Sequence, residues 1–196
     1  DTRALIAGAG THGLFFLVDD MVFIRTVDFG VLARFALERH VPTLRLGRNV
    51  TWSHFADTAR PPPPLHDAGH GLLEWDFGGL LGEWRPLSFD GDMFLRSELQ
   101  VMADAVDFRS PNTFELALRV FLPAFETRRG LCFDHSRVVN IPMNRVQQEF
   151  ANRAGDVTPA ELLARWQAGQ RLHVEAMYGM TTCGMHQDID ASFVNR

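Results

Sequence analysis

An unbroken apolar run that ends in two adjacent carboxylates is the feature that most constrains this chain. It reads Leu14-Phe15-Phe16-Leu17-Val18, then Asp19-Asp20, and then Met21-Val22-Phe23. A continuous run of this length is typical of a strand buried on both faces, as in a parallel α/β sheet. Ligand sites in such sheets lie at the carboxyl ends of strands. Two neighbouring anions there repel each other and lose hydration, and a divalent cation bound between them and a phosphate relieves both effects. The alternative is a surface turn, because Asp is a common turn residue.

Composition fits one globular domain over residues 1–196. The chain is 46% hydrophobic and 22% charged, so it can bury a substantial core. Its net charge of -5 and the absence of a basic run argue against nucleic-acid binding. No apolar stretch approaches the roughly 20 residues that span a bilayer, and two cysteines do not suggest a disulfide scaffold. We therefore expect a soluble, cytoplasmic chain without a transmembrane segment, whose partners are small molecules or uncharged polymers.

The order of elements predicts an α/β fold with a mostly parallel sheet flanked by helices. Helices are expected after the capping residues Asp28, Ser97, Asn112 and Thr158. Short strands are expected over residues 43–46, 86–94 and 138–141. The segment from the four prolines at 61–64 to Gly82 predicts a long loop of the functional kind.

The beginning of the chain bears on the completeness of the sheet. Only a short Ala/Gly-rich segment, residues 4–10, precedes the first convincing strand. A parallel sheet needs crossover connections of about a dozen residues or more. We therefore expect the N-terminal strands to be missing and the strand over residues 14–19 to leave an apolar edge exposed, which is an aggregation hazard.

An ordered set of motifs carries a resemblance to a known family. The motifs are VDDMVF (18–23), SFDGDMFLR (88–96), SPNTFELAL (110–118), NIPMNRVQ (140–147), Asn152-Arg153 with Gly155, and a His near the C-terminus. In order and spacing this set resembles bacterial glycosyltransferase-like proteins of the GT-A, family 2 type, over about residues 14–186. The resemblance implies a GT-A fold from the Asp motif to the C-terminus, a nucleotide-sugar donor held through Mg²⁺ or Mn²⁺, and a carbohydrate or glycan acceptor. The strands that precede the Asp motif in that fold are almost entirely absent from this sequence.

The chemistry of such a transfer assigns roles to several carboxylates. The leaving diphosphate needs neutralisation of its developing charge; by resemblance Asp20 is the direct metal ligand, with Asp19 beside it at the donor. The acceptor hydroxyl needs a base. Glu115 is the first candidate, because it lies one turn into a helix where related enzymes carry the base. The alternative role for Glu115 is to complement the helix dipole. If Glu115 is not the base, Asp92 or Asp90 is the next candidate for that role.

Other residues are candidates for binding the substrates. Asp90 matches the family motif and is expected to contact sugar hydroxyls, although turn chemistry also explains Asp90 and Asp92. Trp75 and Trp84 either offer flat apolar faces to a sugar ring or anchor the loop on the core. Arg145 either pairs with the diphosphate or ties its loop to Glu149.

His186 follows a Gly/Thr-rich segment near the C-terminus. A neutral imidazole there can complete a divalent-metal shell when the segment folds over the nucleotide, as in related GT-A enzymes. A lone surface His is the alternative.

Two other function classes stay open. A non-catalytic carbohydrate-binding or scaffold module would lack an organised metal pair, so it is distinguished by whether Asp20 and His186 converge. A Mg²⁺-dependent phosphohydrolase also uses an Asp pair, but it usually needs a supporting lysine. This sequence contains no lysine.

Overall fold

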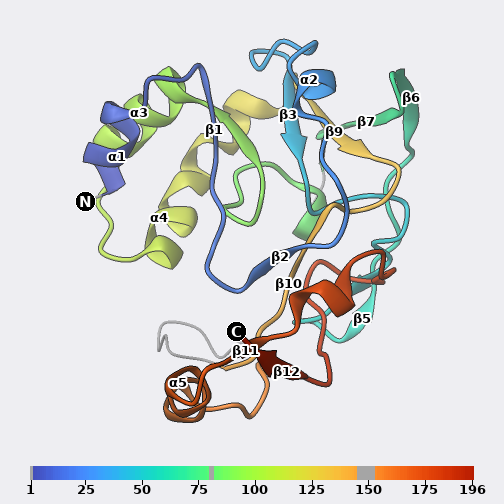
Figure 1. The fold of residues 1–196 in the computed structure, drawn as a ribbon. Coiled ribbons are helices and arrows are strands. Elements are labelled where there is room, and N and C mark those ends of the chain that lie inside the picture. The colour runs from blue at the N-terminus through green and yellow to red at the C-terminus, as the bar shows by residue number, and fades with distance from the viewer. Residues whose placement is uncertain (1, 80–81, 145–152) are drawn as a thin grey trace.

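The computed structural model describes residues 2–79, 82–144 and 153–196, and they form a mixed α/β fold (Figure 1). Its helices are α1 (Thr2–Gly8), α2 (Phe29–Leu32), α3 (Arg96–Ala105), α4 (Pro111–Leu118) and α5 (Pro159–Gln167), with 3-10 turns η1 (Gly82–Trp84), η2 (Arg119–Phe125) and η3 (Val174–Met177). Its strands are β1 (Gly13–Phe15), β2 (Met21–Phe23), β3 (His40–Thr43), β4 (Trp52–Ser53), β5 (Thr58–Ala59), β6 (His66–Gly69), β7 (Leu72–Asp76), β8 (Met93–Leu95), β9 (Arg129–Phe133), β10 (Val138–Asn140), β11 (Gln170–Leu172) and β12 (Phe193–Asn195).

The largest sheet has four strands in the order β3-β9-β7-β6. Only β3 and β9 run parallel, whereas β9–β7 and β7–β6 are antiparallel. The expectation of a mostly parallel sheet is therefore wrong for the described strands. The reason is local, because β6 and β7 form a hairpin whose turn has positive φ at Gly69, His70 and Gly71, and a hairpin makes its two strands antiparallel.

The prediction of a long loop up to Gly82 is also wrong, because this segment contains β6 and β7. Strand β7 lies inside the sheet, between β6 and β9. Its Leu72, Leu73 and Trp75 are buried. Trp75 packs directly over Gly130 of β9, and a Cβ at Gly130 would overlap the indole ring. Glycine is thus required at position 130, because the indole of its cross-strand partner Trp75 lies where a Cβ would be.

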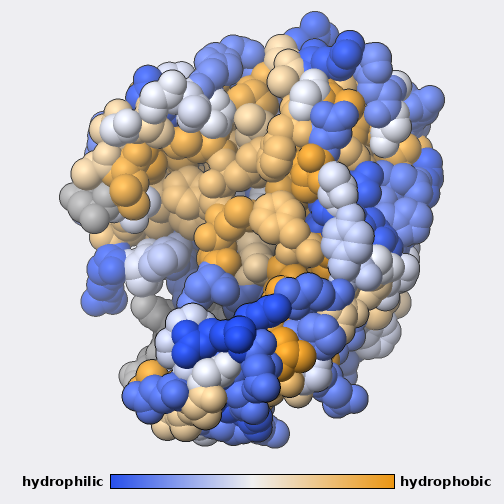
Figure 2. Space-filling view, in the orientation of Figure 1, coloured by the Kyte–Doolittle hydropathy of each residue, from blue (hydrophilic) through white to orange (hydrophobic). Residues whose placement is uncertain are grey.

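The apolar run at residues 14–18 is not a strand buried on both faces. Strand β1 spans three half-buried residues, and Leu17 is 46% exposed. In the described part of the chain β1 pairs only with β8, so its second edge has no strand partner. Figure 2 shows apolar surface gathered over the region of β1 and α4. Leu17, two residues after β1, and Leu116 of α4 are exposed apolar residues.

The main hydrophobic core lies between the sheet and α1, α3 and α4, which lie to one side of it in Figure 1. It joins Trp75 and Trp84 to Phe89, Phe94 and Phe114. Strand β10 leaves this layer to pair with β2, and it leads to the C-terminal α5, β11 and β12 at the lower end of Figure 1. This strand therefore links the core to the C-terminal elements.

Two predicted helix starts are confirmed and two are wrong. Asp28 accepts a hydrogen bond from the Val31 N–H and caps α2, although that helix is only four residues long. Thr158 caps α5 by accepting from the Glu161 N–H. The N-cap of α4 is Ser110 rather than Asn112, and Ser97 lies inside α3. In the described residues no helix is long and apolar enough to cross a membrane.

Candidate active site

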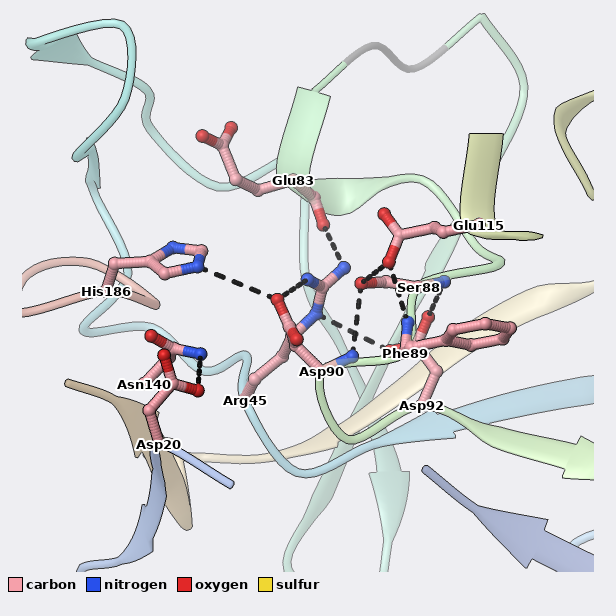
Figure 3. A network of polar contacts seen from close by, with 10 residues as sticks. All are labelled: Asp20, Arg45, Glu83, Ser88, Phe89, Asp90, Asp92, Glu115, Asn140 and His186. Atoms are coloured by element: carbon pink, nitrogen blue, oxygen red, sulfur yellow. Dashed lines mark hydrogen bonds and ion pairs between the residues drawn. The ribbon is translucent and has the colours of Figure 1, made fainter. Parts of the chain in front are cut away.

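Four segments that lie far apart in the sequence meet at one place (Figure 3). Asp20 precedes β2, and Asn140 ends β10 and pairs with Met21. Asn140 also forms a parallel bridge to His186. The fourth segment carries Asp90, whose Oδ2 lies 3.6 Å from His186 Nε2. The backbone ladder of β2, β10 and the C-terminal segment thus brings Asp20 and His186 to the same place, next to Asp90.

Asp20 is held in place by Asn140. Asn140 Nδ2 donates a hydrogen bond of 2.6 Å to Asp20 Oδ1. Burial, reinforced by the negative charges of Asp90 and Asp19, raises the pKa of Asp20 to about 6. The Asp19 side chain is exposed. The structure therefore separates the two predicted carboxylates: Asp20 faces the cluster and Asp19 lies at its rim.

His186 is a neutral imidazole in this environment. Its side chain is 9% exposed. Burial, aided by the charges of Arg45 and His54, lowers its pKa to about 3. The neutral ring is the form that binds metal ions. The alternative of a lone surface His is excluded by this burial.

A buried guanidinium lies at the centre of the cluster. Arg45 is 4% exposed; its Nε lies 3.6 Å from Asp92 Oδ1 and its Nη1 3.9 Å from Asp90 Oδ2. It also donates a 3.3 Å hydrogen bond to the carbonyl of Glu83. Burial raises the pKa of both carboxyls, and Arg45 opposes that shift. Sequence reasoning missed Arg45, and its signal was a charge between two apolar residues in the Leu44-Arg45-Leu46 segment.

Two of the candidate bases, Glu115 and Asp92, have different surroundings. Glu115 Oε2 accepts hydrogen bonds from the Phe89 N–H (3.0 Å) and the Ser88 hydroxyl (3.4 Å). Burial and then the charge of Asp90 raise the pKa of Glu115. Glu115 is the fifth residue of α4, beyond its first turn, so the helix-dipole alternative accounts for it poorly.

Asp92 is not placed to serve as a base. It is 2% exposed, its Oδ2 accepts from the Ser88 N–H at 3.0 Å, and its Oδ1 faces Arg45. A base must come within hydrogen-bond reach of the acceptor hydroxyl. Asp92 instead stabilises the 88–92 turn from inside, and we correct its assignment accordingly.

The remaining predicted residues do not join the cluster. Trp75 and Trp84 are 2% and 4% exposed and pack edge to face, and Trp75 Nε1 donates to the Trp84 carbonyl. They anchor the core and offer no face to a sugar ring, which is the second of the two interpretations given above. Arg145 lies outside the described residues.

The donor atoms of the cluster decide whether it suits a divalent cation. Asn140 Oδ1 is buried and has no hydrogen-bond partner. Together with Asp20, Asp90 and His186 it forms a set of three oxygen-bearing side chains and one imidazole, the ligand chemistry of Mg²⁺ or Mn²⁺. As placed, no three His, Cys, Asp or Glu side chains of the described chain are arranged to hold one ion. The donor chemistry thus fits, and ligation requires these side chains to turn towards one another.

Comparison of the chain with known protein families, with curated proteins and with solved structures gave no match.

Proposed function

We propose that this protein is a metal-dependent glycosyltransferase that moves a sugar from a nucleoside-diphosphate sugar to an acceptor hydroxyl. The observation that carries the proposal is the convergence of Asp20 and His186 on Asn140, next to Asp90. A carbohydrate-binding or scaffold module does not require two distant segments to bring a carboxylate and a neutral imidazole together. The motif resemblance over residues 14–186 points to the same reaction.

The binding roles follow from the contacts. Asp20, Asp90, Asn140 and His186 would hold Mg²⁺ or Mn²⁺, which when bound neutralises charge on the leaving diphosphate. Asn140 orients the Asp20 carboxylate through its Nδ2. Arg45, buried beside Asp90 and Asp92, supplies the positive charge that opposes these two carboxylates. Asp19, exposed at the rim, is free to contact the donor.

Glu115 is our candidate for the base that takes the acceptor proton. Two donors, the Phe89 N–H and the Ser88 hydroxyl, fix its Oε2. Its raised pKa brings the carboxylate closer to the ideal for proton transfer near neutral pH. Asp90 lies between Glu115 and Asp20 in Figure 3, where it could contact sugar hydroxyls.

We further propose that the mixed sheet is part of a GT-A-type fold and that the protein works in the cytoplasm. The parallel β3–β9 pair, with Arg45 two residues beyond β3, supports a site beside the carboxyl end of a strand. Both cysteines are free thiols, which fits a reducing compartment.

A donor screen tests this function. Wild-type protein is incubated with Mn²⁺, a panel of nucleoside-diphosphate sugars and a panel of glycan acceptors, and release of nucleoside diphosphate is measured. We expect release with at least one donor, dependent on Mn²⁺ and on acceptor, and lost in Asp20→Ala. Asp67→Ala, at an exposed carboxylate of β6, is the matched control and should retain release. Release of inorganic phosphate instead would identify a phosphohydrolase and contradict the proposal.

A further inference from the structure

A cavity of about 370 Å³ lies next to the candidate active site. We name it the side pocket; its walls are three segments, residues 141–143, 153–157 and 187–191. Pockets of roughly 300 to 1,000 Å³ are the usual size for small-molecule ligands. Nothing in the proposed metal and base roles uses this cavity.

The side pocket begins where the active-site cluster ends. Asn140 and His186, the bridged pair of the cluster, are followed directly by the pocket residues Ile141 and Gln187. The Ile141 N–H donates to the Asp20 carbonyl at 2.8 Å, and the Gln187 N–H donates to the Asn140 carbonyl at 3.0 Å. A ligand in the side pocket would therefore lie beside the same backbone that positions Asp20.

A network of charged groups joins the 153–157 and 187–191 segments of the side pocket. Asp188 Oδ1 lies 3.0 Å from Nε2 of the buried His54. Its Oδ2 accepts a 2.7 Å hydrogen bond from Arg153, which also faces Asp57 at 3.6 Å. The hydrogen bonds to Asp188, led by that with His54, lower its pKa, so this carboxylate is ionised at neutral pH.

Backbone hydrogen bonds join the 141–143 and 153–157 segments. The Gly155 N–H donates to the Pro142 carbonyl at 2.7 Å, and the Val157 N–H donates to the Met143 carbonyl at 3.3 Å. A Cβ at Gly155 would come within 2.8 Å of the Met143 oxygen, so the close approach of the two segments depends on this glycine. The cavity is thus bounded by segments that are held by hydrogen bonds.

The lining has the mixed chemistry that a sugar ring requires. Apolar side chains that can lie against C–H groups are Ile141, Pro142, Met143, Val157 and Ile189. Polar side chains that can bond to hydroxyls are Gln187 and the carboxylates of Asp156, Asp188 and Asp190. Arg153 is the single cation of the lining, and its charge is engaged by Asp188. The excess of negative charge repels phosphates and carboxylates.

We infer that the side pocket binds a neutral or amino sugar unit of the acceptor glycan, and that it selects against acidic sugars. This inference rests on the proposed glycosyltransferase function, because an acceptor glycan exists only for a transferase. The diphosphate donor is the wrong occupant, because three carboxylates surround the cavity and one paired arginine does not offset them.

The test is direct binding of glycans to the metal-free protein by NMR. The probes are methyl glycosides and disaccharides of gluco, galacto and manno configuration, each as the neutral, amino and uronic acid form. We expect at least one neutral or amino probe to bind, at least tenfold more tightly than its uronic acid counterpart. In Ala154→Phe, which fills the cavity, binding should fall at least tenfold. Ala164→Phe, at an exposed position of α5 outside the pocket, is the matched control and should bind as wild type does.

A second variant keeps the test sharp if Ala154→Phe fails to fold. Asp156→Asn removes one wall charge from an exposed side chain and should narrow the preference for amino over uronic acid probes about threefold or more. Binding of no probe, a preference for uronic acids, or glycan binding unaffected by both variants would overturn the inference. Glycan binding should persist in Asp20→Asn. If wild-type protein binds sugars but no Mn²⁺, the proposed function is refuted and the side pocket remains as a lectin-like site.

Discussion

Asp20→Asn is expected to stabilise the metal-free protein while it removes metal binding. Burial and the nearby acids raise the pKa of Asp20 from 3.8 to about 6. A group whose folded pKa is raised binds its proton more tightly in the folded state, so folding stability falls as pH rises from about 4 to about 6. Above that window the ionised carboxylate penalises the fold in full, and a neutral amide escapes the penalty.

The magnitude follows from the shift. About two pKa units at 1.36 kcal/mol each give a ceiling of about 3 kcal/mol. Water reaches a side chain that is only partly buried, so we discount this to about 1 to 2 kcal/mol. For a chain of this length that corresponds to a rise in Tm of about 3 to 6 °C. An amide at position 20 keeps an oxygen that can accept from Asn140.

Calorimetry in EDTA between pH 4 and pH 8 measures this effect on wild type and Asp20→Asn. We expect the variant to unfold at higher temperature at pH 8 and the difference to vanish near pH 4. Asp19→Asn, at the exposed neighbour, is the matched control and should change Tm by much less. A variant that is equally or less stable than wild type at pH 8, or a difference that does not depend on pH, would refute the reasoning.

Three further outcomes are expected. Glu115→Gln should lower turnover by about 10² to 10⁴ with donor affinity unchanged, and near-normal turnover in a coupled assay for nucleoside diphosphate would remove Glu115 from the base role. Arg45→Met should lower the free energy of unfolding, measured in urea at pH 8, by about 3 kcal/mol. This loss should shrink at low pH, because burial raises the pKa of Asp92 and the carboxylate takes up a proton. A loss that does not change with pH would contradict this. Trp75→Ala should cost about 3 to 5 kcal/mol in the same assay, because its ring is 2% exposed, whereas a loss below about 1 kcal/mol would place it outside the core.

Local signals in the sequence predicted part of the local structure: two of the four expected helix starts are confirmed, and two are wrong. Asp28 and Thr158 cap helices as expected because a side-chain oxygen near a free N–H acts within one turn. The loop prediction for residues 61–82 was wrong. Its prolines and glycines suggested a loop, whereas Leu72, Leu73 and Trp75 belong to a strand buried between β6 and β9. The pattern that could have revealed it is Gly-His-Gly followed by Leu-Leu-Glu-Trp.

Some members of the candidate site were predictable from the sequence, but the others and the assembly of the site were not. Asp20, Asp90 and Glu115 were recognised as candidate acids, and in the structure the charge of Asp90 acts on both Asp20 and Glu115. Asn140 and Arg45 were not assigned to the metal site, because their contributions depend on long-range contacts. Asn140 matters through its bridge to His186, and Arg45 through carboxylates about 45 residues away in the sequence.

The most direct test of the central claim is pulsed electron paramagnetic resonance of Mn²⁺ added to the protein at pH 7.5. We expect Mn²⁺ to bind with the nuclear coupling of one histidine nitrogen, to lose that coupling in His186→Ala, and to fail to bind in Asp20→Ala. His135→Ala, at an exposed histidine outside the cluster, should leave the spectrum unchanged. Mn²⁺ bound without histidine coupling, or binding that survives in Asp20→Ala, would contradict a metal centre formed by Asp20 and His186.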